Sequence, residues 1–151
     1  MYLQGREMQL AQLNIAQTKY PLDDARMKEF TDNLEPINTI ADASEGFVWR
    51  LIGESGNATD IQAFSDPNII VNMSVWSSIE SLKDFMFKTH HRDYLRRKQE
   101  WFHTIENANY VLWWVEDGTI PCVNDGIVRL EHLRSYGDSP YAFSFKVPFS
   151  A

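Results

Sequence analysis

The sequence predicts an α+β fold: a ferredoxin-like antiparallel sheet with helices on one face, followed by an added C-terminal helix and strand. Two periodicities predict it, because apolar and polar residues alternate in some segments and apolar residues recur every three or four positions in others. These segments follow one another in the order β-α-β-β-α-(α)-β. With 151 residues, 44% of them hydrophobic, the chain can form one compact domain over 1–151, and 1–7 are an extension without assigned structure.

The first half of the chain supplies two strands, a helix and a loop. Residues 11–15 alternate between apolar and polar, as in a strand with one buried face. Residues 24–44 have helical apolar spacing, and Pro36 within them predicts a bend because it lacks a backbone donor. Residues 47–52 form a second strand, and 53–68 a long polar loop.

The second half repeats the alternation. Residues 69–76 form a strand in which Asn72, Ser74 and Trp76 share one face, and the tetrapeptide 77–80 is a capping box that starts a helix. The later elements are a helical stretch at 93–105, a strand at 110–115, a helix from Asn124 to Gly137 and a last strand at 141–149.

Charge and composition exclude several classes of protein. The formal charge of −7 argues against nucleic acid as a partner, since that binding needs Lys and Arg to neutralise phosphates. No apolar run approaches the length that spans a bilayer, and the N-terminus lacks an apolar signal core, so we expect a cytoplasmic protein. The single Cys122 excludes an internal disulfide and a multi-cysteine metal site, and we interpret it as a small apolar filler.

The predicted sheet has a consequence for assembly. With helices on one face only, the other face would be uncovered, although strands such as 110–115 (YVLWWV) carry bulky residues on both sides. A second copy of the chain would bury that apolar surface. We therefore expect a homodimer.

Several phrases of the sequence resemble a known family. They are GFVWRL, VNMSVWSSIESL, KQEWF, YVLWWV with IPCV, and RLEHLRSYGDSPYAFSF, within residues 9–149. They resemble the uncharacterised bacterial family named domain of unknown function 3291. The order of elements and the phrase NMSVWSSIESLKDF resemble the dimeric α/β-barrel superfamily of antibiotic-biosynthesis-monooxygenase type.

The resemblance implies a dimeric α/β barrel but does not select an activity. The superfamily includes cofactor-free quinone-forming monooxygenases, haem-degrading monooxygenases, haem peroxidases, aldoxime dehydratases and a carotenoid monooxygenase. Fold membership alone does not choose among them.

The resemblance implies three catalytic candidates, Asn72, Trp76 and His90. Asn72 and Trp76 match a strand asparagine and a strand-end tryptophan of cofactor-free monooxygenases, where an amide binds a phenolate or hydroperoxide oxygen and an indole shapes a dry pocket. The alternative is that Trp76 packs against the following helix and Asn72 bonds within the sheet. His90 and His91 point roughly 100° apart on a helix, so only one can face a pocket, and the alternative is a capping or surface histidine.

The prediction for cofactors follows from the same region. Phe85 or Met86 holds the position of the axial histidine of haem-degrading enzymes, which argues against haem degradation. We predict no resident cofactor and leave haem binding open. No spacing of His, Asp and Glu resembles a three-ligand site, so we predict no metal.

Four residues are candidates for substrate binding: Arg50, Trp49, Trp113 and Trp101. Trp49 and Arg50 are consecutive in a strand and point to opposite faces. An inward Arg50 could hold an anionic or phenolate substrate, whereas an outward one would pair with acids at the surface. Of Trp113 and Trp114, one should be core and the other could line a cavity or a dimer seam.

Three functions remain open. The first is a monooxygenase-like enzyme acting on a small aromatic or polyene substrate inside the barrel. The second is a non-catalytic protein that binds a hydrophobic ligand or haem. The third is a structural dimer whose core is filled by its own aromatic side chains.

Overall fold

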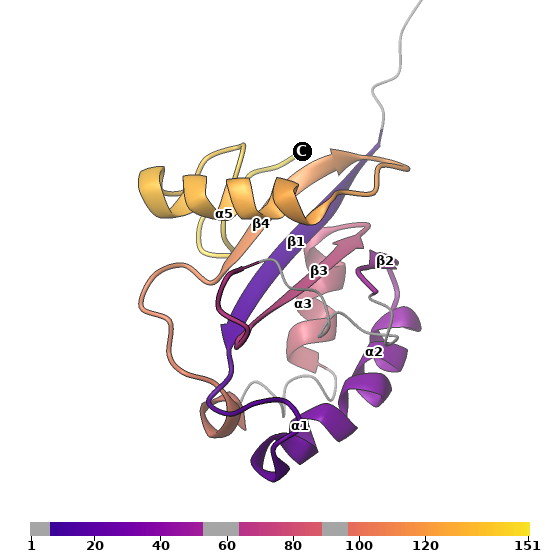
Figure 1. Ribbon diagram of the computed structural model, residues 1–151. Coiled ribbons are helices and arrows are strands. Elements are labelled where there is room, and N and C mark those ends of the chain that lie inside the picture. The colour runs from indigo at the N-terminus through magenta and orange to yellow at the C-terminus, as the bar shows by residue number, and fades with distance from the viewer. Residues whose placement is uncertain (1–6, 53–63, 89–96) are drawn as a thin grey trace, which may run out of the picture.

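A computed structural model of the protein describes residues 7–52, 64–88 and 97–151 (Figure 1). Its centre is a four-stranded sheet with the strand order β2-β3-β1-β4, in which all neighbours are antiparallel. The strands are β1 (Met8–Gln17), β2 (Phe47–Arg50), β3 (Ile69–Trp76) and β4 (Tyr110–Glu116). This topology, together with the helices, confirms the predicted ferredoxin-like α+β fold.

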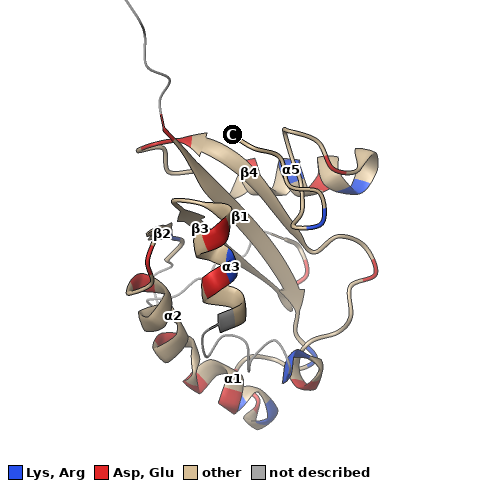
Figure 2. Ribbon diagram, turned by 180° about the vertical axis from the view of Figure 1, so that it is seen from behind, with Lys and Arg blue, Asp and Glu red and all other residues tan. Residues whose placement is uncertain are grey.

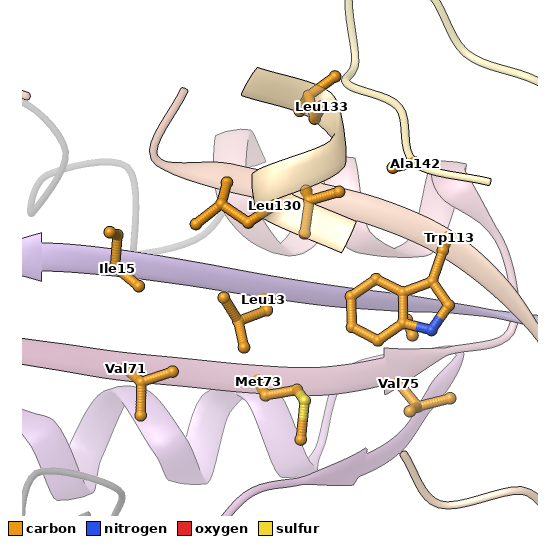
Figure 3. Close-up of a cluster of buried hydrophobic side chains, with 11 residues drawn as sticks. Leu13, Ile15, Val71, Met73, Val75, Trp113, Leu130, Leu133 and Ala142 are labelled. Atoms are coloured by element: carbon orange, nitrogen blue, oxygen red, sulfur yellow. The ribbon is translucent and has the colours of Figure 1, made fainter. Parts of the chain in front are cut away.

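The helices lie on both sides of the sheet (Figure 1). Four of them are α1 (Lys28–Asp32), α2 (Leu34–Asp42), α3 (Ile79–Lys88) and α5 (Val123–Tyr136), and residues 97–101 are also helical. Two residues of β1, three positions apart, show the division. Leu10 packs in a cluster with Ala41 of α2 and Leu82 of α3, whereas Leu13 packs with Leu130 of α5 (Figure 3). We call these two sides the α2/α3 face and the α5 face.

The α5 face is covered by the chain itself. We expected this face to be bare, but α5 lies over β1 and β4, and Leu13, Val111 and Trp113 beneath it are at most 1% exposed. The neighbouring strand β3 is equally enclosed there, with Met73 and Val75 at 0% exposure. The argument for a dimer through an uncovered sheet face therefore loses its premise.

The segment expected as one helix at 24–44 is divided. A short 3-10 turn at Ala25–Met27 precedes α1, and Asn33 separates α1 from α2. Pro36 lies in the first turn of α2, where backbone N–H groups have no intrahelical acceptor, so its missing donor is tolerated. The break therefore comes before the proline and not at it.

Two helix starts also differ in detail from the prediction. Helix α3 is capped by Ser78 and not Ser77, because the Ser78 hydroxyl accepts from the backbone N–H of Ser81 at 3.1 Å. Helix α5 begins with an exposed Cys122 as its N-cap, and the Asp125 carboxylate accepts from the Cys122 N–H at 3.0 Å. The carboxylate three residues into the helix reaches back to the cap, which explains why Asn124 is not the capping residue.

The last predicted strand, 141–149, is reduced to one bridge between Phe143 and Leu112. Side chains take the backbone N–H groups that would continue a ladder. Asp138 accepts from Ser144 N at 2.7 Å, and the Tyr110 hydroxyl accepts from Phe145 N at 3.0 Å. Such local side-chain acceptors compete with sheet formation.

None of the described helices combines the length and apolar content needed to cross a membrane.

The contact between α5 and β1 yields a prediction about stability. A Cβ atom at Gly126 would lie 2.5 Å from Cδ1 and 2.8 Å from Cβ of Leu13. We expect Gly126→Ala to lower the free energy of unfolding by about 1–2 kcal/mol, because overpacking of about 1–3 kcal/mol outweighs a gain in helix propensity of up to about 1 kcal/mol. Chemical denaturation measures the change.

Two controls isolate the cause. Ser135→Ala, on an exposed position of the same helix, should leave stability nearly unchanged. Leu13→Ala removes Cδ1 and Cγ but keeps Cβ, so Gly126→Ala should lower the stability less in that background. An unchanged loss there would show that the close approach to Leu13 is not the reason.

Candidate functional site

Four polar residues interrupt the apolar α2/α3 face of the sheet. They are Gln12 and Asn14 on β1 and Asn72 and Ser74 on β3, and we call them the polar band. The register places Gln12 opposite Ser74 and Asn14 opposite Asn72. Alternate residues of a strand share a face, so all four side chains project toward the side of α2 and α3.

Hydrogen bonds connect the polar band into one network. The Gln12 amide nitrogen Nε2 donates to Asn72 Oδ1 at 2.7 Å and to Ser74 Oγ at 2.8 Å. The Gln12 carbonyl oxygen accepts from Asn14 Nδ2 at 3.2 Å. The Ser74 hydroxyl also accepts from the indole Nε1 of Trp76 at 2.9 Å. Asn72 and Trp76 are therefore linked through Gln12 and Ser74.

Aromatic clusters flank the polar band at both ends. On one side Leu10, opposite Trp76, belongs to the Trp76 cluster, which also contains Phe85 of α3. On the other side Ile70 packs against the Trp101 cluster, which contains Met27 and Phe30. The α2/α3 face is therefore apolar, then polar, then apolar along β3.

The polar band is buried at one end and open at the other. Gln12 is 6% exposed and Ser74 is 7% exposed, whereas Asn72 is exposed to solvent. Because Asn72 Oδ1 accepts from Gln12, the open end presents the amide nitrogen. Among the described residues this nitrogen has no hydrogen-bond acceptor, so it can donate to a ligand oxygen.

Trp76 packs against the following helix, which was the alternative to a role in a pocket. Its side chain is 1% exposed, stacks on Phe85 at 5.3 Å between ring centroids and meets Phe47 edge-to-face at 5.5 Å. The indole thus supports the polar band from within the core and does not line an open cavity. Asn72 likewise bonds within the sheet through its oxygen, while its nitrogen remains available.

Arg50 lies beside the polar band, and its guanidinium group forms an ion pair with a carboxylate. It is opposite Ser74 in the β2–β3 register, on the α2/α3 face. Its Nε and Nη2 atoms donate to the two carboxylate oxygens of Asp42, at 2.8 and 3.3 Å. Asp42 ends α2, so the ion pair joins that helix to the sheet; Figure 2 shows further acidic positions along α2 and α3.

The tryptophan candidates do not converge on Asn72. Trp49 and Trp113 pack on the α5 face, on the other side of the sheet, and Trp113 contacts the guanidinium of Arg129 at 5.3 Å. Trp113 is the core member of its pair, and Trp114 donates from Nε1 to the Phe149 carbonyl at 2.8 Å. The sheet separates Trp49 and Trp113 from the polar band.

Trp101 lies on the same face as the polar band, in a charged setting. Arg97 covers its ring at 4.8 Å and pairs with Glu29 and Glu100, each at 2.6 Å. The hydrogen bond from Arg97 lowers the pKa of Glu100 from its usual value. These residues, with Tyr20 and Arg26, border a surface hollow of about 320 Å³.

His90, together with His91, lies outside the described residues, so the structure does not place it. The described histidines lie away from the polar band, His103 next to the end of β1 and His132 on α5. The described residues contain no group of His, Cys, Asp and Glu that could hold a metal ion. Phe85, one of the two positions at which the resemblance implies the axial histidine of haem-degrading enzymes, stacks on Trp76.

Gln12 is the member of the site that sequence analysis missed. Alternation in 11–15 marked it only as the polar side of a strand with one buried face. The missing information was the register, which joins β1 to a strand 60 residues away and places Gln12 between Asn72 and Ser74. Two polar positions at the same spacing in both strands were the available signal.

The comparisons with known sequences match one family. The family described as "Domain of unknown function (DUF3291)" matches residues 9–151, which confirms the resemblance noted in the sequence. No curated protein matches the chain.

Solved structures with similar folds come from several organisms. A conserved protein from Methanosarcina mazei Go1 is 13% identical, with a TM-score of 0.52 over 73% of this chain and 93% of that one. PA3566 from Pseudomonas aeruginosa is 11% identical, with a TM-score of 0.50 over 77% and 100%. A protein from Nitrosomonas europaea named "Putative antibiotic biosynthesis monooxygenase" is 14% identical, with a TM-score of 0.48 over 80% and 96%. At these identities the likeness concerns the fold alone.

The link between Trp76 and Ser74 can be measured by a double-mutant cycle. Trp76→Phe keeps an aromatic ring against Phe85 but removes the Nε1 donor, and Ser74→Ala removes the acceptor. We expect a coupling of about 1 kcal/mol in the free energy of unfolding, the usual contribution of one hydrogen bond. Additive losses would contradict the bond, since independent residues do not couple.

Proposed function

We propose that this chain, which belongs to the DUF3291 family, binds a small aromatic molecule at Asn72 and converts it by monooxygenase-like chemistry. One observation carries the proposal: the polar band ends at an exposed amide between the Trp76 and Trp101 clusters. Apolar and aromatic surface with a few convergent polar groups is typical of small-molecule sites.

The stability of the fold alone does not explain why the polar band is polar. Gln12 can be buried because its polar atoms are hydrogen-bonded. Replacing both partners of such a hydrogen bond with apolar residues of the same shape can, however, leave the stability nearly unchanged. The band occupies the middle of a face that is otherwise packed with aliphatic and aromatic side chains. A ligand at its open end gives these polar residues a role that packing does not.

The chemistry proposed for Asn72 is stabilisation of an oxygen anion. A hydroxyarene that loses its proton carries a negative oxygen, and a fixed amide N–H donor lowers the energy of that anion. Such a phenolate can react with dioxygen without a cofactor: one oxygen atom enters the ring, the other leaves as water, and the substrate supplies the electrons as it becomes a quinone. Among the described residues of this face, we assign none to the transfer of the proton from the hydroxyarene.

Binding without turnover is the second candidate, and a specific observation favours it. The indole that would shape a reactive pocket is enclosed by Phe47 and Phe85. Its only polar atom already donates to Ser74. A ligand at Asn72 would then be held at the surface of the aromatic packing, as in a carrier or sensor. A core filled by its own aromatic residues is the third candidate.

Ligand binding and oxygen uptake test the proposal. We expect a panel of hydroxylated arenes to quench tryptophan fluorescence and at least one to consume dissolved oxygen with quinone absorbance. Asn72→Ala should weaken binding by about tenfold or more, because hydrogen bonds to charged groups contribute about 1.5–3 kcal/mol. Fluorescence titration and an oxygen electrode give both quantities.

The controls separate the three candidates. Asn124→Ala removes an exposed amide on α5, and Arg97→Ala alters the Trp101 cluster; both should weaken binding less than Asn72→Ala does. Binding that depends on Asn72 without oxygen uptake would favour the carrier. No binding by any hydroxyarene would reject a ligand site at the polar band.

We also propose a homodimer, through the edge of the sheet and not through the α5 face. Val48 and Ile52, in and beside the edge strand β2, are 42% and 55% exposed. Light scattering should give twice the chain mass of 17.6 kDa. Val48→Glu with Ile52→Glu should yield the monomer mass, whereas Ile120→Glu, on a residue elsewhere that is 64% exposed, should not. A wild-type monomer at micromolar concentration would exclude the dimer.

A further inference from the structure

We propose that Gln12 is a positioning residue that turns the amide nitrogen of Asn72 outward, so that the site selects ligands whose polar group accepts hydrogen bonds. The inference rests on the proposed ligand site at Asn72. It adds a second residue, which does not touch the ligand, and a rule for which polar groups the site admits.

Hydrogen bonds occupy the whole amide group of Gln12. Both amide hydrogens are used, one on Asn72 Oδ1 at 2.7 Å and one on Ser74 Oγ at 2.8 Å. Its oxygen accepts from Asn14 at 3.2 Å. With the Gln12 side chain 6% exposed, reversing its amide alone would place nitrogen against nitrogen at Asn14 and oxygen against oxygen at Asn72.

Ser74 and Trp76 hold the network from the buried side. The Ser74 hydroxyl accepts both from Gln12 and from the Trp76 indole, and an indole nitrogen can only donate. Trp76 itself is held between Phe47 and Phe85. Both donations end on Ser74 Oγ, which fixes the buried end of the polar band, and the second hydrogen of the Gln12 amide goes to Asn72.

The consequence appears at the exposed end of the polar band. Asn72 can satisfy Gln12 only with its oxygen, which leaves its Nδ2 donors outward. A carbonyl, quinone or phenolate oxygen can accept from these donors, whereas a group that only donates finds no acceptor there. A ligand that leaves a polar partner unpaired is rejected, which is the usual origin of selectivity at such sites.

Side-chain amide exchange tests the orientation without any ligand. In nitrogen-15 spectra, the Gln12 NH₂ hydrogens should exchange with water far more slowly than those of Asn72, because both Gln12 hydrogens are bonded and buried. Fast exchange at Gln12, comparable to that of Asn72, would overturn the proposed arrangement.

Gln12→Glu then tests selectivity with nearly the same shape. An ionised carboxylate only accepts, so Asn72 would turn its nitrogen toward residue 12 and present its oxygen outward. Acetophenone, which only accepts, and aniline, which mainly donates, serve as neutral probes, so that the added charge has little effect on either. We expect wild type to prefer acetophenone about fivefold and Gln12→Glu to prefer aniline, from the contribution of one neutral hydrogen bond.

The variants distinguish the possible failures. If neither probe binds wild type, or if Asn72→Ala binds both equally well, the ligand site itself is rejected. If acetophenone binding needs Asn72 but Gln12→Glu keeps the wild-type preference, only the positioning role is rejected. Gln12→Met, which removes the amide without adding charge, should abolish the preference; it provides the same test if Gln12→Glu does not fold.

Discussion

The central strand β1 is constrained on all sides, and the rest of the structure depends on it. It is hydrogen-bonded to β3 and β4 at its edges and packed by helices on both faces. Leu13 must fill the space below α5, and Leu10 the space below α3. Gln12 lies between these two leucines in sequence and points to the α2/α3 face, where its amide must form hydrogen bonds inside the protein. A shift of one residue in register would exchange these faces and place Gln12 against α5.

The packing of α5 decides how the sheet is completed. Gly126 lets the helix backbone approach Leu13, and the helix encloses Val111 and Trp113 without help from a second chain. A ferredoxin-like sheet with helices on one side would leave this surface to a partner. Here the added C-terminal helix covers β1 and β4 on that face, while Val48 and Ile52 at the edge strand β2 are exposed.

Local patterns predicted much of the fold but less of the site. Period-two alternation correctly placed Asn72, Ser74 and Trp76 on one face of β3, and it placed Trp49 and Arg50 on opposite faces of β2. It did not predict that Arg50 would be held by Asp42, since that depends on where α2 ends relative to β2. The prediction of a last strand at 141–149 was wrong because side chains of Asp138 and Tyr110 accept hydrogen bonds from its backbone N–H groups.

By itself the sequence determined the order of the four strands and the main helices and which strand side chains share a face, because these follow from the periods of local backbone geometry. It also determined the family, through phrases spread along the chain. Tertiary structure alone decided that α5 covers the second face and that Gln12 meets Asn72 and Ser74. The contacts of Gln12 join residues about sixty positions apart, and strand register, which no local pattern specifies, determines which of them meet.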